Sequence, residues 1–213
     1  MEAAGDGGPE RGAGDGSRVR LPEHVRLTGD GVVLREWEDG DLDAMVTLFD
    51  DPQVAYWTPL VSPFGLQAAR TYLERSRQRR AAGESVQLVI TVDGGEPAGE
   101  VLLMFRGLGP DLAAIGYSVG AAHRGRGLAT AAVRLMTEYA RETVGVDRLL
   151  LEIEDDNAPS VAVARATGYR LTDAPPAPAE GKGRSITLRT WEYAEPGARD
   201  GNEGNGGKSG GTT

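Results

Sequence analysis

The sequence predicts an α/β fold in which helices pack on a mixed β-sheet. Two observations point to this class. Short runs of β-branched and apolar residues alternate with stretches in which apolar residues recur at helical spacing. The chain of 213 residues is also long enough for one ordinary domain, with residues left over at both ends. The expected order is strand, two helices, three strands, helix, strand, helix and two strands.

Both ends of the chain are expected to be disordered, glycine-rich tails. Residues 1–17 and 197–213 hold 13 of the 31 glycines and almost no large apolar side chain. Such segments cannot bury enough apolar surface to offset the entropy lost on ordering. We therefore expect a tail over residues 1–23, a folded domain over residues 24–196 and a second tail over residues 197–213.

Composition argues against several function classes. The net charge of −9 and the pI of about 4.8 argue against nonspecific nucleic-acid binding. The chain has no cysteine and two histidines, so disulfides and thiolate nucleophiles are excluded and no metal site is expected. No apolar run approaches the roughly 20 residues of a membrane span, and no hydrophobic signal region is present. A cytoplasmic protein without membrane contact is expected.

The first half of the chain predicts a strand, two helices and two further strands. Val32–Arg35 has the β-branched residues of a strand. Apolar residues recur at helical spacing between Asp41 and Asp51-Pro52, so a helix is expected there. Ser62-Pro63 resembles a cap followed by proline at the first helical position, so a second helix is expected from there to Ala82. Strands are expected at Val86–Val92 and Ala98–Phe105.

The second half predicts strands and helices in alternation. A strand is expected at Ala114–Val119, and the most regular helix of the chain at Leu128–Val144. Arg148–Ile153 is expected to be a buried strand, because its leucines are apolar on both faces. Asn157 opens a short helix that Gly168 ends. The last strands are expected at Tyr169–Leu171 and Ser185–Tyr193.

A glycine-rich turn separates the strand before it from the most regular helix. This glycine loop, residues 123–129, reads His-Arg-Gly-Arg-Gly-Leu-Ala. Gly125 and Gly127 allow a tight turn and a close approach of a ligand to the backbone. Backbone N–H groups at a helix N-terminus bind anions, and Arg124 and Arg126 add positive charge. The loop is therefore a candidate phosphate cradle, the alternative being a surface turn with two solvated arginines.

Several motifs, in order along the chain, resemble those of the GNAT N-acetyltransferase superfamily. The family's acetyl-CoA loop has the pattern Arg/Gln-x-x-Gly-x-Gly/Ala, matched here by Arg124, Gly127 and Ala129. The resemblance spans about Val32 to Tyr193. Asn157-x-x-Ser160 is similar to the branch that includes ribosomal-protein N-terminal acetyltransferases. The resemblance implies a mixed, mainly antiparallel sheet flanked by helices.

The resemblance also implies a reaction, in which an amine attacks the thioester of acetyl-CoA directly. The pantetheine arm would lie beside the strand that ends at Val119, whose backbone would stabilise the developing oxyanion. Ser160 would be the acid for the leaving thiolate, and Asn157 would bond the pantetheine, although helix capping explains both residues nearly as well. The implied cofactor-binding residues are Val119, Arg124, Gly125, Arg126, Gly127, Leu128, Ala129, Asn157 and Ser160.

The general base is the least defined part of the implied site. The family often has a glutamate where this chain has Ala114, and a tyrosine where it has Ala164. Glu100 is a candidate catalytic base, as are Glu152 and Glu154, each with a solvated carboxylate as the alternative. Near pH 7.5, an α-amine of pKa about 7.7–8.0 is roughly a third neutral, whereas a lysine of pKa about 10.4 is about 0.1% neutral. A poor base therefore favours an α-amine or another weakly basic acceptor.

Other interpretations remain open at this point. The acceptor could be a protein N-terminus or a small-molecule amine, and longer acyl-CoAs could replace acetyl-CoA. The alanines at positions 114 and 164 also fit a non-catalytic acyl-CoA-binding regulatory domain. The acceptor pocket is expected from two irregular segments, Tyr56–Pro59 and Pro175–Arg184. The acidic run Glu152–Asp156 could attract a cationic acceptor, although a solvated strand end explains it as well. The protein is expected to be a monomer or homodimer.

Overall fold

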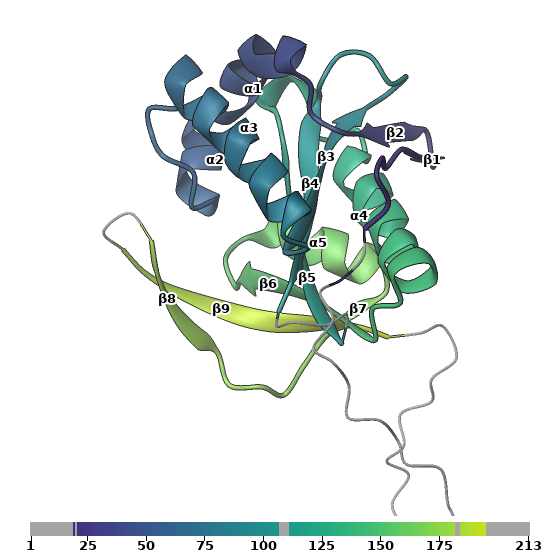
Figure 1. The fold of residues 1–213 in the computed structure, drawn as a ribbon. Helices are drawn as coiled ribbons and strands as arrows, with labels where there is room; N and C mark the ends of the chain where they lie inside the picture. The colour runs from purple at the N-terminus through teal and green to yellow at the C-terminus, as the bar shows by residue number, and fades with distance from the viewer. Residues whose placement is uncertain (1–18, 20, 107–110, 182–183, 195–213) are drawn as a thin grey trace, which may run out of the picture.

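The computed structural model describes residues 19, 21–106, 111–181 and 184–194 (Figure 1). Within these residues the strands are β1 (Leu27–Gly29), β2 (Val32–Arg35), β3 (Ser85–Thr91), β4 (Gly99–Phe105), β5 (Leu112–Val119), β6 (Arg148–Glu154), β7 (Tyr169–Leu171), β8 (Ala177–Gly181) and β9 (Arg184–Tyr193). The α-helices are α1 (Leu42–Phe49), α2 (Pro52–Trp57), α3 (Leu66–Ala81), α4 (Leu128–Glu138) and α5 (Ala158–Ala166). Short 3-10 turns cover Asp39–Asp41 and Ala121–His123, and a π-helical segment, Tyr139–Val144, continues α4.

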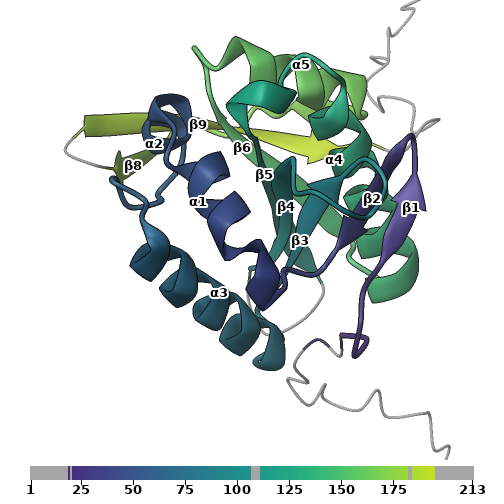
Figure 2. The ribbon, with the colours of Figure 1, turned by 90° about the horizontal axis from the view of Figure 1, so that it is seen from above.

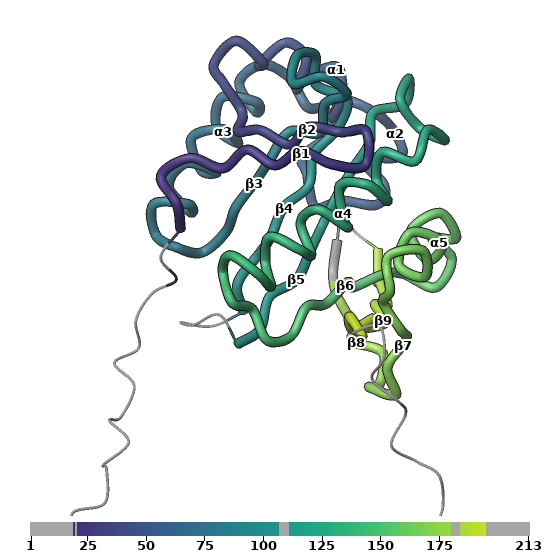
Figure 3. Tube along the Cα trace, turned by 90° about the vertical axis from the view of Figure 1, so that its right-hand side faces the viewer, coloured from purple at the N-terminus to yellow at the C-terminus, as the bar shows by residue number. Residues whose placement is uncertain are grey.

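The strands form one mixed sheet in the order β1-β2-β3-β4-β5-β6-β9-β7, and β8 also pairs with β9. The pairing of β5 with β6 is parallel, and the other pairings between the described strands are antiparallel. Helices α1 and α3 cover one face of the sheet, called here the α3 face (Figure 2). Helices α4 and α5 cover the other, called here the α4 face (Figure 3). The predicted fold class, with its mainly antiparallel sheet, is confirmed.

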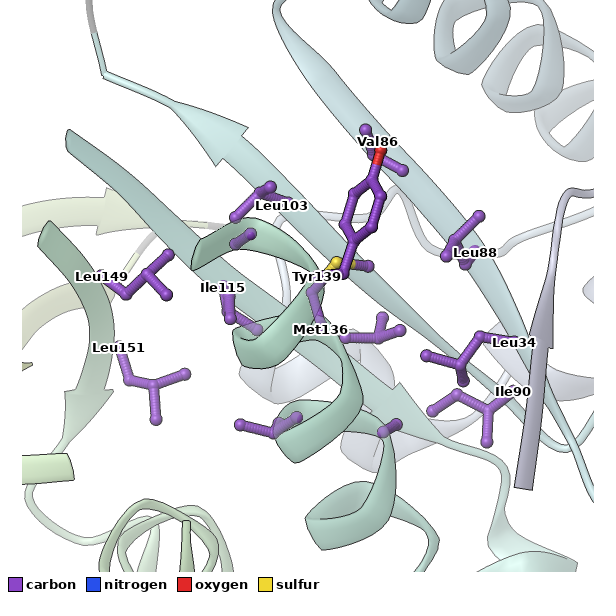
Figure 4. Close-up of a cluster of buried hydrophobic side chains, with 14 of the residues drawn as sticks. Leu34, Val86, Leu88, Ile90, Leu103, Ile115, Met136, Tyr139, Leu149 and Leu151 are labelled. Carbon is purple, nitrogen blue, oxygen red and sulfur yellow. The ribbon is translucent and has the colours of Figure 1, made fainter. Parts of the chain in front are cut away.

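The sheet separates two hydrophobic cores, because successive strand residues point to opposite faces. The larger core lies on the α4 face, where Met136 of α4 meets branched side chains from β2 to β6 (Figure 4). The smaller core lies on the α3 face, where Phe49 packs edge to face against Trp37, Phe64 and Tyr72. Apolar packing therefore stabilises the helices on both faces of the sheet, and the buried side chains of Arg35, Asp41 and Glu100 are polar exceptions within it.

A buried ion pair ties the end of β2 to the start of the helical region. The Arg35 guanidinium donates to both oxygens of Asp41, at 2.7 and 2.9 Å. It also donates to the carbonyl oxygens of Gly94 and Gly95, in the β3–β4 turn, at 3.0 and 2.7 Å. The two side chains are 11% and 10% exposed. The pair therefore joins three segments that are separated in the sequence.

The region between α1 and α3 differs from the prediction. Asp51-Pro52 does not simply end the first helix: it opens α2, because Asp51 accepts hydrogen bonds from two backbone N–H groups of the first turn, at 3.0 Å each. The predicted helix start at Ser62-Pro63 is wrong, since α3 begins at Leu66. Phe64 is buried in the smaller core and its N–H donates to Asp50, which holds the preceding residues in a turn.

Other differences concern short elements and chain ends. The sequence pattern does not predict β1 or β8, which gain their order from pairing with β2 and β9. The helix expected to reach Val144 is α-helical to Glu138 and π-helical beyond it. The predicted tails lie almost entirely outside the described residues, but Leu21, inside the predicted first tail, packs against the larger core. Among the described helices, none has the length and apolar character needed to cross a bilayer.

Replacing Asp41 by alanine should lower the free energy of unfolding by about 3 kcal/mol, because Arg35 would keep a buried, unpaired charge. Asp39→Ala is the matched control, since its pair with Arg77 is exposed and worth less than about 1 kcal/mol.

The advantage of the wild type over Asp41→Ala should also depend on pH. Burial alone would raise the pKa of Asp41, but hydrogen bonds from Arg35 and the Glu38 N–H hold it below its usual value. The wild-type advantage should therefore persist above about pH 4 and disappear as the pH falls through the folded-state pKa. Urea unfolding checks both points, and equal losses in the two variants would contradict them.

Candidate active site

An open strand edge lies near the middle of the sheet, where β5 and β6 part. The two strands pair in parallel through Leu112–Ala114 and Arg148–Leu150. From Ile115 to Val119, β5 keeps its pairing with β4 but makes no pair with any described strand on the side of β6. Backbone polar groups on such an edge need a partner, and an extended ligand lying along the edge can supply one.

The glycine loop follows β5 and leads into α4. Gly125 and Gly127 have φ angles of +74° and +78°. A Cβ added at either position would meet no atom within 4 Å, so the backbone conformation, and not crowding, calls for glycine. Gly127 is the N-cap residue of α4, and no side chain caps this helix. The first backbone N–H groups of α4 are therefore available to an anion.

The two arginines of the glycine loop have different surroundings. Arg124 turns back toward the protein, where its Nε donates to the Val119 carbonyl at 3.0 Å and its Nη2 donates to Asp51 at 2.6 Å. Arg126 is exposed, and its Nη1 lies 3.4 Å from Nδ1 of His123. A carboxylate thus offsets the charge of Arg124, while the charge of Arg126 remains on the loop surface.

The first turn of α5 lies across the open edge from β5. Asn157 caps the helix, because its Oδ1 accepts from the Ser160 N–H at 3.2 Å. The capping interpretation of Asn157 is confirmed, and its amide NH₂ group remains a donor. The Tyr117 hydroxyl of β5 lies 3.5 Å from the Ser160 carbonyl oxygen. Nothing in the sequence separates Tyr117 from an ordinary strand tyrosine, so it is absent from the predicted site.

Glu100 lies on the α3 face of β4, where its side chain is almost fully buried. The Trp37 Nε1 group donates to one carboxylate oxygen at 2.8 Å, and the Tyr72 hydroxyl donates to the other at 2.6 Å. Burial raises the pKa of Glu100 to about 7, although both hydrogen bonds act in the opposite direction. The alternative of a solvated carboxylate is therefore wrong for Glu100. Across the strands it pairs with Ser118, one residue before Val119.

The other two candidate bases, Glu152 and Glu154, each form an ion pair with an arginine. Glu152 forms an ion pair with Arg106. Glu154 accepts two hydrogen bonds from Arg184, at 2.6 and 2.7 Å. These pairs neutralise much of the acidic run that these residues begin. They weaken the hypothesis that the run attracts a cationic acceptor.

Arg184 also joins α2 to the β8–β9 hairpin. Its Nη2 donates to the Tyr56 carbonyl oxygen at 2.8 Å. Its guanidinium carbon lies 4.0 Å from the centroid of the Tyr56 ring and 5.8 Å from that of Trp57. The two segments predicted to build the acceptor pocket therefore meet. They are only partly irregular, however, because Tyr56 and Trp57 belong to α2 and the other segment contains β8.

A hollow of about 590 Å³ lies beside the glycine loop, between the start of α4 and the β1–β2 turn. Arg126 and Gly127 contribute to its walls, and so do Asp30 and Arg134, which form an ion pair at 2.6 Å. Neither Val119 nor Ser160 lines this hollow, so it does not include the residues predicted for the reacting centre. In the part of the chain that the structure describes, no group of three or more acidic or histidine side chains could hold a metal ion.

Residues 32–170 match the model of a family described as "Acetyltransferase (GNAT) domain". The chain belongs to this GNAT acetyltransferase family. It is therefore an acyl-CoA-dependent N-acetyltransferase, with acetyl-CoA as its cosubstrate. The family resemblance predicted from the glycine loop and the later motifs is confirmed.

Named relatives of this acetyltransferase include an enzyme whose name refers to the N-acetylation of L-amino acids. The L-amino acid N-acetyltransferase AaaT of Escherichia coli K12 is 28% identical over 166 residues, covering 77% of this chain and 93% of AaaT. Mycobacterium smegmatis RimJ in complex with CoA-disulfide superposes with a TM-score of 0.65 at 22% identity, covering 79% of this chain and 86% of RimJ. RimL, the ribosomal L7/L12 α-N-protein acetyltransferase, superposes in complex with coenzyme A with a TM-score of 0.68 at 19% identity, covering 79% and 97%. The two superpositions show a shared fold.

The stability of the wild-type protein should fall as the pH rises from about 4.5 to above 7, because the folded state keeps the Glu100 proton longer than the unfolded state does. The expected loss is about 3 kcal/mol, and Glu100→Gln should remove most of this slope. Urea unfolding between pH 4.5 and 8 measures it. Glu74→Gln, at an exposed position on α3, is the control and should keep the wild-type slope. An unchanged slope in Glu100→Gln would contradict the environment described for Glu100.

Proposed function

We propose that this acetyltransferase moves the acetyl group of acetyl-CoA to an α-amino group at the open edge of β5. The observation that carries the proposal is the placement of three features around that edge. The glycine loop lies at its end, the first turn of α5 lies across from it, and the buried Glu100 lies on the neighbouring strand. A thioester placed beside Val119 would lie between the glycine loop and α5, with Glu100 buried on the neighbouring strand.

The cofactor half of the proposed site uses mainly backbone groups. The amides of residues 125–129 would hold the pyrophosphate, helped by the exposed charge of Arg126. The Val119 backbone would face the thioester carbonyl and stabilise its oxyanion. The free NH₂ group of Asn157 would donate to the pantetheine arm, since the oxygen of that amide is used in the cap.

In the proposed reaction, the amine nitrogen attacks the thioester carbon, the carbon–sulfur bond breaks and CoA leaves as a thiolate. The Ser160 hydroxyl would donate the proton that the thiolate gains, and would itself regain a proton from solvent. Glu100 would receive the proton that the amine loses, because a carboxyl of pKa about 7 can act as a base near neutral pH. Glu100 is buried, so this proton would pass through the Tyr72 hydroxyl that donates to it.

The α-amine is the acceptor class that best suits this site. A single buried base can do little for a lysine, of which about 0.1% is neutral near pH 7.5. The name of AaaT refers to L-amino acids, and the name of RimL refers to an α-N-protein substrate. The proposal includes either acceptor, in a cytoplasmic monomer or homodimer that binds no nucleic acid.

An amine panel tests the acceptor class. At pH 7.5, kcat/KM for an α-amine should exceed that for an Nα-blocked lysine by at least about 10²-fold, following the neutral fractions of the two amines. Thiol release from acetyl-CoA measures the rates, with propionyl- and succinyl-CoA as alternative donors. A preference for lysine side chains would overturn the α-amine assignment. Acetyl-CoA binding without turnover of any amine would support the regulatory domain instead.

Ser160→Ala should lower kcat by roughly 10²-fold while leaving the KM for acetyl-CoA nearly unchanged, because the hydroxyl acts on the leaving thiolate and not on binding. Steady-state kinetics with the best amine of the panel provide the measurement. Tyr117→Phe is the companion variant, because its hydroxyl lies beside the same turn of α5. If Tyr117→Phe lost the activity and Ser160→Ala kept it, the acid would be Tyr117.

A further inference from the structure

Arg124 links the glycine loop to a helix outside the cofactor region. Its Nη2 lies 2.6 Å from Oδ1 of Asp51, and the two side chains are 32% and 15% exposed. The same carboxylate oxygen accepts from two backbone N–H groups at the start of α2, so Asp51 is the N-cap of that helix. The other bond of Arg124 runs to the carbonyl of Val119, at the end of β5. One guanidinium thus connects the loop, the open strand edge and α2.

α2 depends on contacts at its ends. It has six residues, and Val54 is the one among them that is buried. Helices this short are not stable alone, so their order comes from tertiary contacts. At the first turn of α2, the cap residue Asp51 is bonded by Arg124. At the last turn, Arg184 contacts the carbonyl oxygen and the ring of Tyr56. α2 therefore lies between the cofactor loop on one side and the β8–β9 hairpin on the other.

We infer that Arg124 is a positioning residue that makes the order of α2 depend on the bound cofactor. The inference rests on the proposed function, in which CoA occupies the glycine loop. It also uses the expected acceptor pocket, because Tyr56–Pro59 begins in the last turn of α2. A ligand that stabilises the loop conformation also stabilises the Arg124–Asp51 bridge, and through it the first turn of α2. Such coupling is reciprocal, so a broken bridge weakens CoA binding as well as releasing α2.

The bonding of Arg124 favours this role over direct phosphate binding. Its Nε and Nη2 are both used inside the protein, and its charge is offset by a carboxylate. Burial would raise the pKa of Asp51, but the bond from Arg124 and the two N–H groups of α2 hold it below its usual value, so the carboxylate is charged at neutral pH. A phosphate would have to compete with that carboxylate, whereas the α4 N-terminus and Arg126 have no such partner among the described residues.

Asp51→Asn tests the ion pair between Arg124 and Asp51 without removing the N-cap of α2. Asparagine caps helices about as well as aspartate, so α2 keeps its N-cap and loses the charge that holds Arg124. Arg124→Gln breaks the bridge from the other side. Asp39→Asn is the matched control, because it removes an exposed ion pair, with Arg77 of α3, that does not involve α2 or the glycine loop. Circular dichroism and the unfolding curve of each variant establish that it is folded.

Hydrogen exchange of α2, measured with and without saturating CoA, gives a readout that needs no acceptor. In the wild type, CoA should slow exchange of the Ala55 and Thr58 amides, which bond within α2, by at least about fivefold. Asp51→Asn and Arg124→Gln should each lose that response, and the double variant should behave like either single one.

Calorimetry should show a similar rise in the Kd for CoA, at least about fivefold, in both single variants. Asp39→Asn should match the wild type.

Two results would overturn the inference while leaving the proposed function intact. One is CoA binding to the wild type without any change in α2 exchange. The other is weaker CoA binding in Arg124→Gln with an unchanged Kd and exchange response in Asp51→Asn, which would make Arg124 a phosphate ligand. Failure of the wild type to bind CoA would be a different result, because it would overturn the proposed function and this inference together.

Discussion

The parting of β5 and β6 is the constraint on which the rest of the site depends. After three parallel pairs, the strands separate, and on the side of β6 the backbone groups of β5 have no partner among the described strands. Backbone polar groups that are shielded from water are costly unless something bonds them. The protein supplies one partner itself, since Arg124 bonds the carbonyl of Val119. The remaining edge has the form that an extended ligand can complete, and the glycine loop and α5 are placed around it.

Ion pairs in this acidic protein connect segments more than they create a charged surface. Arg35 with Asp41 joins β2 to the first helical turns, Arg124 joins the glycine loop to α2, and Arg184 joins β9 to the end of β6. Each arginine is paired with a carboxylate, so its charge is largely used within the fold. In the proposed site, the backbone N–H groups of α4 and the exposed Arg126 are the groups that would attract a phosphate.

The two faces of the sheet have different roles around the same strands. The α4 face is apolar and fixes α4, and with it the glycine loop, against β5. The α3 face has an apolar core as well, but it encloses Glu100 with Trp37 and Tyr72. Burial of this carboxyl costs stability at neutral pH and keeps a titratable group next to the end of β5. In the proposed reaction, protein stability and proton transfer would thus be linked through one side chain.

Much of the scaffold could be predicted because its signals are local. Glycines at positive φ in residues 123–129, the cap at Asn157 and the apolar strand β6 each follow from a few neighbouring residues. Where a local signal has two meanings, the prediction was incomplete. The first helix does end before Asp51-Pro52, but these residues also begin α2. Strands such as β8 have no local signal, because their order comes from a partner strand.

Tertiary structure alone decided which side chains meet. The sequence by itself determined the family, the glycine loop and most of the elements that carry the site. It did not show that Arg124 would reach Asp51, 73 residues away. Nor did it show that Trp37 and Tyr72, which lie 63 and 28 positions before Glu100, would enclose that carboxylate. The physical reason is that backbone conformation follows from short-range preferences, whereas the pKa of a carboxyl and the partner of a guanidinium depend on long-range packing.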